Sequence, residues 1–216
     1  TYVDTLNPEA IQEFIKETHE KYYGLLKEDF GKCVPSIFTD EPQFSHKTQM
    51  GRADEKCDIV LPYTESFEAR YQAQYGESFF DRLPEVIWET EDAAGHGVRY
   101  RYHELLAEQF ASAFADTLGG WCCDHGLWLT GHMMEEPTLR SQTAALGEAM
   151  RSYRSFQLPG IDMLCDSREY TTAKQAQSAA HQYGREGVLS ELYGVTNWDY
   201  DFRRHKLQGD WQAALG

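Results

Sequence analysis

Short apolar runs alternate with helix-patterned segments along most of the chain. The runs cover residues 34–39, 127–130, 161–165 and 188–190, and each follows a segment whose apolar residues recur at helical spacing. Parallel strands need a crossover between them, so this alternation predicts right-handed βαβ units and a parallel sheet. The runs show little polar alternation, which is typical of a sheet covered on both faces or closed into a barrel. An open Rossmann-like sheet and a barrel both fit this pattern.

The segments between these runs predict helices whose ends can be located. Asn7 followed by Pro8 is typical of an N-cap and a first helical turn, so a helix is expected from Pro8 to about Lys27. A break is expected at Pro84, because proline lacks a backbone N–H and clashes with the preceding turn. Further helices are predicted over residues 67–75, 102–126, 139–153, 172–183 and 202–216. The chain is predicted to form one domain, 1–216, with a long inserted connection at about 43–97.

Charge and composition exclude several classes of protein. Lys and Arg number 20 against 35 Asp and Glu, and the net charge of −15 would repel phosphate backbones, so no nucleic acid partner is expected. No apolar run approaches the roughly 20 residues that span a bilayer, and the first residues lack a signal-peptide pattern, so no membrane partner is expected. Five unevenly spaced cysteines predict neither a disulfide framework nor a zinc site, and reduced thiols fit the cytoplasm. No cofactor or metal is expected.

Polar residues follow the apolar runs at the point where each predicted strand ends. They are Asp40 with Glu41, then His132, Asp166 and Glu191. In a (β/α)8 barrel the C-terminal ends of the strands converge on one active face. An open sheet would gather the same residues in a crevice, but usually beside a glycine-rich nucleotide turn, and the sequence contains no such motif. The pattern favours the barrel.

Two carboxylates on opposite sides of one pocket are what glycosidic cleavage needs. One protonates the leaving oxygen and the other attacks or stabilises the anomeric carbon, at a separation of about 5 Å for retention or about 6.5–9.5 Å for inversion. Glu41 and Glu191 are the candidates. Sugar rings also stack on aromatic faces, and Trp128 lies near these strand ends. The residues predicted to contact substrate are Asp40, Phe44, His132, Tyr193 and Trp198.

Four segments carry a resemblance to a known family. Residues 35–42 (PSIFTDEP), 129–132 (LTGH), 159–162 (PGID) and 188–194 (VLSELYG) resemble a poorly characterised family of bacterial glycoside hydrolases. Its members have (β/α)8 barrels akin to β-galactosidase-like and α-L-rhamnosidase-like enzymes. In the wider clan of retaining barrel glycosidases, the acid/base glutamate ends strand four in an Asn-Glu-Pro-like setting and the nucleophile ends strand seven. The resemblance implies that Glu41 is the acid/base and Glu191 the nucleophile. Asp40 replaces the usual Asn, and could share the acid's role or bind a cation.

Counting from the Glu41 strand as the fourth, the resemblance implies that the chain holds strands four to seven. It then resembles the second half of a barrel, with strands one to three expected before Thr1 and the eighth after Gly216. Because a (β/α)8 domain typically needs about 250 residues, we expect either a missing remainder or self-association that hides the exposed strand edges.

Three functions are open to such a chain. The first is a glycoside hydrolase acting on a carbohydrate. The second is a metal-dependent hydrolase using Asp40, Glu41 and His132, with Glu136 as a further ligand. The third is a catalytically incomplete carbohydrate-binding or structural fragment. The remaining acids are predicted to be structural, as caps of the next helix or as the acidic first turn of a helix ahead of Pro137: Asp162, Asp166, Glu135 and Glu136.

Overall fold

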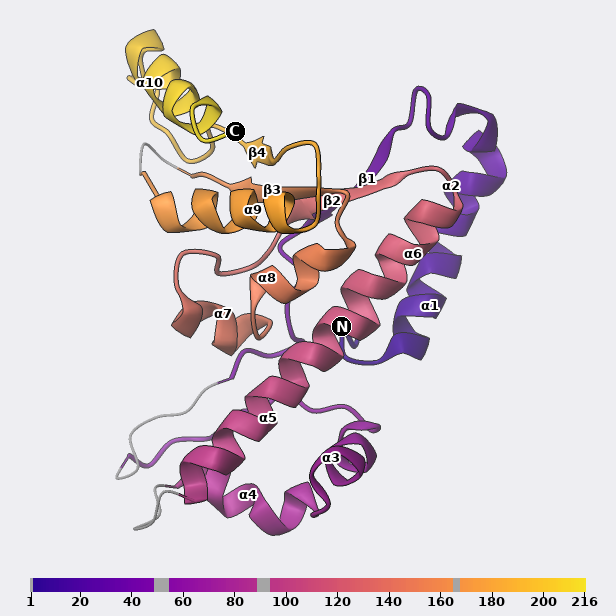
Figure 1. Cartoon of the computed structure of the whole chain (residues 1–216), viewed down its shortest axis with the longest axis vertical. Coiled ribbons are helices and arrows are strands. Elements are labelled where there is room, and N and C mark those ends of the chain that lie inside the picture. Colours follow the sequence, from indigo (N-terminus) through magenta and orange to yellow (C-terminus); the bar gives the residue numbers. More distant parts are fainter. Residues whose placement is uncertain (1, 49–54, 89–93, 165–167) are drawn as a thin grey trace.

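A four-stranded parallel sheet organises the protein. The structure, a computed structural model, describes residues 2–48, 55–88, 94–164 and 168–216. The strands are β1 (Ser36–Asp40), β2 (Trp128–His132), β3 (Leu158–Asp162) and β4 (Leu189–Glu191), and they lie side by side in chain order (Figure 1). Every neighbouring pair is parallel. The predicted parallel sheet with helical crossovers is therefore confirmed.

Ten α-helices lie between and around the strands in the described ranges. α6 packs against β2, α9 packs against β3, and α1 packs against α6. None of the described helices has the length and the apolar character to cross a membrane. The helices are α1 (Pro8–Glu17), α2 (His19–Leu26), α3 (Phe67–Tyr75), α4 (Phe79–Ile87), α5 (Ala94–Phe110), α6 (Thr117–Asp124), α7 (Leu139–Ala145), α8 (Ala149–Ser152), α9 (Tyr170–Gln182) and α10 (Phe202–Ala213).

The first predicted helix is present but divided. Asn7 caps α1 as expected, because its side-chain oxygen accepts a hydrogen bond from the backbone N–H of Glu9 at 2.9 Å. The helical path stops at Thr18, whose φ of −122° leaves the helical region. The Thr18 hydroxyl donates to the carbonyl of Phe14 at 2.6 Å, the back-bonding that bends and interrupts helices at threonine. α2 then starts in a new direction.

One predicted helix break is absent from the structure, and one break that was not predicted is present. α4 continues through Pro84, because the burial of Phe79 and Val86 on one face outweighs the lost backbone hydrogen bond. The helix predicted over 139–153 is instead interrupted after α7 at Gly147, whose φ is +96°. There the chain passes so close to Ala107 that a Cβ on residue 147 would lie 2.4 Å from the Ala107 Cβ. The close approach explains why glycine occupies this turn.

The third strand lies three residues earlier than predicted. Pro159 and Gly160, expected to form a turn, are inside β3. Gly160 lets β3 approach β2, since a Cβ there would lie 2.3 Å from the carbonyl oxygen of Gly131. As a result Asp162, and not Asp166, ends the strand, and Asp166 lies outside the described residues.

The core is built from the long helical run that precedes β2. α5 and α6 are joined by a π-helical segment, η2 (Ala111–Asp116), so the helix predicted over 102–126 is present as one run. Tyr102, Phe110 and Phe114 recur along it at helical spacing and are buried. This run lies between the sheet and the α3–α4 helices (Figure 1).

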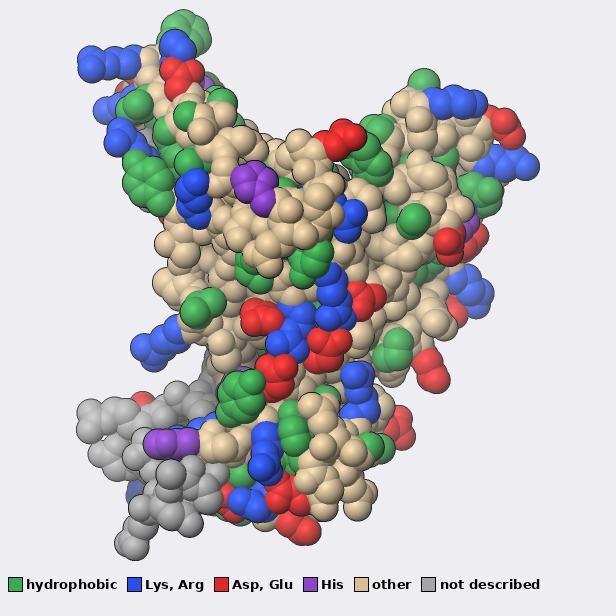
Figure 2. Space-filling view, in the orientation of Figure 1, with side chains coloured by type: hydrophobic (Ala, Val, Ile, Leu, Met, Phe, Trp, Pro, Cys, Tyr) green, Lys and Arg blue, Asp and Glu red, His purple; other side chains and the backbone are tan. Residues whose placement is uncertain are grey.

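One face of the sheet is uncovered in the described part of the chain. α6 and α9 pack on one side, and the surface is hollowed between α10 and the region of α2 (Figure 2). Phe38 and Trp128, which share a face by register, are each 44% exposed. Parallel sheets are ordinarily covered on both faces. Helices of the described residues therefore cover one face of the sheet, and the other face is partly exposed.

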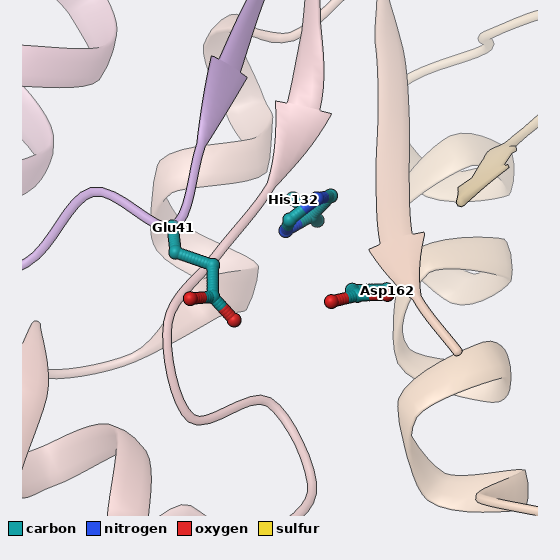
Figure 3. A group of neighbouring side chains, drawn as sticks. All are labelled: Glu41, His132 and Asp162. Carbon is teal, nitrogen blue, oxygen red and sulfur yellow. The ribbon is translucent and has the colours of Figure 1, made fainter. Parts of the chain in front are cut away.

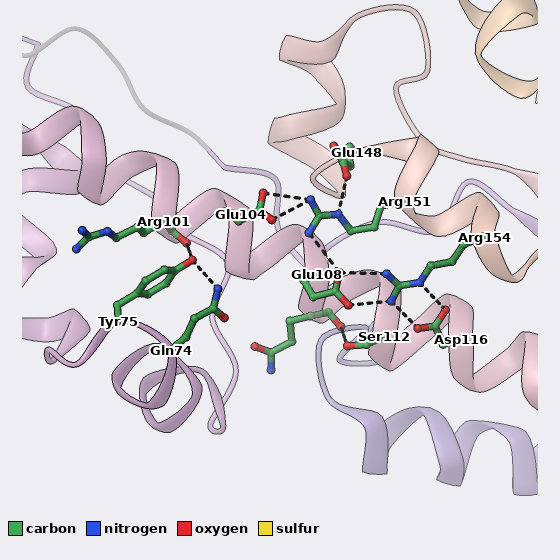
Figure 4. A network of polar contacts seen from close by, with 11 residues as sticks. Gln74, Tyr75, Arg101, Glu104, Glu108, Ser112, Asp116, Glu148, Arg151 and Arg154 are labelled. Atoms are coloured by element: carbon green, nitrogen blue, oxygen red, sulfur yellow. Dashed lines mark hydrogen bonds and ion pairs between the residues drawn. The ribbon is translucent and has the colours of Figure 1, made fainter. Parts of the chain in front are cut away.

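Two arginines connect the core helices to the segment before β3. Arg151 of α8 bonds to Glu104 and Glu108 of α5 (Figure 4). Arg154, in the short helix η3 (Tyr153–Ser155), bonds to Glu108 at 2.8 Å and to Asp116 at 2.6 Å. These bonds between charged groups fix the approach to β3.

Replacing Arg154 with alanine should lower the free energy of unfolding by about 1–2 kcal/mol, because two partly buried carboxylates lose their partner. The side chain of Arg154 is 30% exposed, so solvent screening reduces the effect. Urea unfolding would measure the loss. The control is Lys16→Ala, whose ion pair with Glu13 is exposed to solvent, so its loss should leave the stability nearly unchanged. An equal loss in both variants would contradict the role of this network.

Candidate active site

Every strand of the sheet ends on an acid or a histidine. The last residues are Asp40 of β1, His132 of β2, Asp162 of β3 and Glu191 of β4. Asp40 is in register with His132, and Asp162 with Glu191, so the four side chains gather at one end of the sheet. The predicted convergence of Asp40, His132 and Glu191 is confirmed. Asp162 takes the position expected for Asp166.

His132 is the centre of this group. It is 1% exposed, and its Nε2 lies 2.9 Å from Glu191 Oε2 and 3.7 Å from Asp40 Oδ1. An ionised carboxylate can only accept, so we assign the ring proton to Nε2, which then donates to Glu191. The imidazole ring and the ring of Phe38 pack edge-to-face, with their centroids 5.4 Å apart. Nδ1 is buried without a hydrogen-bond partner in the described residues.

Glu41 and Asp162 approach His132 from two strands. In Figure 3 their carboxyl groups point toward each other beside the imidazole. Glu41 has a φ of +46°, and its N–H donates to the carbonyl of His132 at 3.2 Å, which turns its side chain into the site. One ligand atom from each of the three residues lies within 4.8 Å of the others. Two carboxylate oxygens and one imidazole nitrogen are a set that a divalent cation would accept.

A cavity of about 240 Å³ opens beside this group and is lined by acids. Burial raises the pKa of Asp162, the nearby positive form of His132 lowers it, and the negative charges of Glu191, Glu41 and Asp40 raise it further. Burial also raises the pKa of Glu136, to about 7. The acids that line the cavity are Glu41, Glu135, Glu136, Asp162 and Glu169.

Known structures contain this arrangement of elements. No family model and no curated protein sequence matches the chain. Among solved structures, a rhamnosidase from Novosphingobium sp. PP1Y matches with a TM-score of 0.74 and 18% sequence identity. The chain is similar in fold to part of a rhamnosidase. The match covers 100% of this chain and 20% of that chain, so this chain spans about a fifth of the rhamnosidase's length.

Fold likeness at this identity does not carry function with it, because one fold supports many activities. The mixed α/β architecture with a four-stranded parallel sheet agrees with part of an α/β barrel.

The predicted positions of Glu136 in the first turn of a helix and of Asp162 as a helix cap were wrong. Neither caps a helix: Thr138 caps α7 through its side chain, and Glu169 occupies the N-cap position of α9. Glu135 and Glu136 both precede α7, so neither lies in the first turn of a helix. Glu136 is buried, and Glu135 is partly exposed and forms an ion pair with Lys47.

The aromatic residues predicted to contact substrate differ in exposure: Phe44 is buried and Trp198 is exposed. Phe44 is 2% exposed and packs edge-to-face on Phe110, so its ring has no free face for a sugar. The chain turns inward after Pro42, and the N–H of Phe44 donates to the carbonyl of Ala145 at 2.7 Å. Tyr193 packs against His205 with ring centroids 4.8 Å apart, and Trp198 is fully exposed.

The raised pKa of Glu136 predicts a pH-dependent stability. Its pKa is near the ordinary value of 4.5 in the unfolded chain and about 7 in the folded one. Between these values the folded chain binds more protons, so the free energy of unfolding falls as the pH rises. The Glu136→Gln variant stays neutral, so from pH 4 to pH 8 its stability relative to wild type should rise by on the order of 2–3 kcal/mol. Urea unfolding at several pH values measures the difference, and a constant difference would contradict the prediction.

Proposed function

We propose that the protein is a glycoside hydrolase in which Glu41 is the general acid/base and Glu191 the nucleophile. The observation that carries the proposal is that both carboxylates flank one buried histidine at the C-terminal end of a parallel sheet. Glu191 Oε2 lies 2.9 Å from His132 Nε2, and Glu41 lies within 4.8 Å of a ring nitrogen. Glycosidases use two such carboxylates, placed about 5–9.5 Å apart on either side of the scissile bond. The fold likeness to a rhamnosidase supports the same chemistry.

Each polar group has a distinct role in this mechanism. Glu41 protonates the glycosidic oxygen, Glu191 attacks the anomeric carbon, and Glu41 then takes a proton from the water that releases the sugar. The N–H of His132 orients Glu191 for attack. Asp162 lies beside Glu41, and burial raises the pKa of its carboxyl group above the ordinary value. Asp40, largely exposed at the mouth of the site, is assigned to a sugar hydroxyl.

Hydrolysis of a panel of aryl glycosides, α-L-rhamnosides included, tests the proposal. The panel is applied to the 216-residue chain and to any longer protein that contains it. Release of the aryl alcohol from one class of glycoside is the expected result. Binding of sugars without hydrolysis in either form would favour the catalytically incomplete fragment, and neither binding nor hydrolysis would reject both.

We also propose that the four strands are consecutive strands of a (β/α)8 barrel, the fourth to the seventh. The uncovered face with Phe38 and Trp128 supports this, since β1 and β4 each have one unpaired edge among the described residues. Further strands, from a longer chain or from a second copy, would close that face. Light scattering on the 216-residue chain, whose monomer mass is 24.9 kDa, shows whether a second copy supplies these strands.

A metal-dependent hydrolase is the second candidate, favoured by the grouping of Glu41, His132 and Asp162 within 4.8 Å. Asp162 replaces Asp40 in the ligand set expected from the sequence. The test is elemental analysis after extensive dialysis, followed by activity assays with added Ca²⁺ or Mn²⁺. Absence of a stoichiometric ion, together with activity that chelator leaves unchanged, would reject this candidate.

A further inference from the structure

Glu136 is the most buried carboxyl group at the site. It is 3% exposed, and its carboxyl oxygens accept from the Tyr153 hydroxyl and from two backbone N–H groups. No lysine or arginine of the described ranges forms an ion pair with it. A buried acid without a cationic partner is costly to the fold, so its hydrogen bonds need an explanation.

The contacts of Glu136 join three separate parts of the chain. Oε1 accepts from Tyr153 Oη at 2.9 Å and, at a longer 3.4 Å, from the N–H of Met133, which follows β2. Oε2 accepts from the N–H of Asp162, the last residue of β3, at 3.0 Å. The backbone of Glu136 is fixed too, because Gln142 Nε2 donates to its carbonyl at 2.8 Å. The carboxyl group thus sits on a rigid support and holds the end of β3.

We propose that Glu136 is a positioning residue of the candidate active site, holding the end of β3 so that the Asp162 side chain faces Glu41 and His132. The effect on catalysis rests on the proposed function, whereas the effect on Asp162 does not. Asp162 Oδ1 is buried without a hydrogen-bond partner in the described residues, so the side chain itself contributes little to its own placement. The backbone bond to Glu136 fixes it instead.

The chemistry of the bonds predicts which substitutions preserve this role. A glutamine at position 136 accepts from the Asp162 N–H through its carbonyl oxygen. Its amide donates to Tyr153 Oη, whose own proton then goes to the carbonyl of Gly160, 2.7 Å away. Methionine fills a similar volume but accepts no comparable bond, so the Asp162 N–H would be left unpaired.

The test compares Glu136→Met, Glu136→Gln and the control Tyr153→Phe, which keeps the bond from the Asp162 N–H. Hydrogen exchange of the Asp162 amide, followed by NMR, needs no substrate. We expect it to accelerate at least about tenfold in Glu136→Met relative to the amides of β1, and to change less than about threefold in the other two. For hydrolysis of the aryl glycoside that the wild type cleaves, kcat should fall about 100-fold in Glu136→Met with little change in KM, and Glu136→Gln should restore it.

Wild-type exchange at Asp162 and wild-type kcat in Glu136→Met would overturn the proposal. If Glu136→Met does not fold, Glu136→Gln decides alone, because lost protection of Asp162 in that folded variant contradicts the hydrogen-bond argument. If the wild type cleaves no glycoside, the proposed function fails by itself, and the exchange measurement still decides the role of Glu136.

Discussion

The Glu191→Gln variant should hydrolyse aryl glycosides at least about 1,000-fold more slowly than the wild type, because an amide cannot attack the anomeric carbon. The substitution keeps the side-chain volume, and the amide oxygen still accepts from the N–H of His132, 2.9 Å away in the wild type. The loss is therefore chemical and leaves the fold intact. Initial rates of aryl alcohol release, with circular dichroism as a check of folding, measure it. The control is Glu13→Gln on α1, an exposed glutamate paired with Lys16.

The same assay separates the two carboxylates. In Glu191→Ala, added azide should restore turnover by occupying the space of the missing nucleophile. In Glu41→Ala, the first release of an aryl alcohol that needs no protonation should stay fast, and release of one that needs protonation should be lost. Steady-state turnover should be slow for both, because Glu41 also deprotonates the attacking water. Full activity in Glu191→Gln would contradict the assignment of the nucleophile, and identical profiles in the two alanine variants would contradict the division of roles.

The Gly131→Ala variant should lose about 4 kcal/mol or more of unfolding free energy, or fail to fold. Gly131 has a φ of +127°, and a Cβ at this position would lie 2.0 Å from the carbonyl oxygen of Thr39 and 2.7 Å from its nitrogen. Backbone atoms of β1 cannot yield as a flexible side chain would, so β1 and β2 would have to separate beside the candidate site. Thermal and urea unfolding report the loss.

Gly24→Ala provides the matched control for that substitution. Gly24 lies inside α2, and no atom lies within 4 Å of the added Cβ. Alanine should stabilise the helix there by about 0.5–1 kcal/mol. A Gly131→Ala protein as stable as Gly24→Ala would show that β1 and β2 are farther apart than the structure has them.

The strand ends could be predicted wherever an apolar run led directly into an acid or a histidine. This held for β1, β2 and β4, whose terminal residues Asp40, His132 and Glu191 were all identified. It failed for β3, because Pro159 and Gly160 have the local signature of a turn. Glycine is needed at position 160 for a different reason: a Cβ there would lie 2.3 Å from a backbone oxygen of the neighbouring strand. That neighbour is distant in sequence, so no local sequence pattern predicts the contact.

Glu136 was missed for a related reason. Two acids ahead of Pro137 are typical of a helix start, yet α7 begins at Leu139. The partner that matters, Tyr153, lies 17 residues away and meets Glu136 only when η3 packs beneath the sheet. Phe44 was wrongly predicted to contact substrate because it follows a strand end in the sequence. The sequence does not show that the chain turns inward there and buries the ring.

The acidic lining of the cavity bears on which sugars can enter it. The only cation that pairs with one of its acids in the described residues is Lys47, which faces Glu135. With a chain charge of −15 around it, the cavity carries a negative potential toward an approaching ligand. Uronic acids and sulfated or phosphorylated glycosides would meet repulsion at the entrance, whereas neutral sugars would not. If the protein acts on glycosides as proposed, these acids would favour uncharged glycosides over anionic ones.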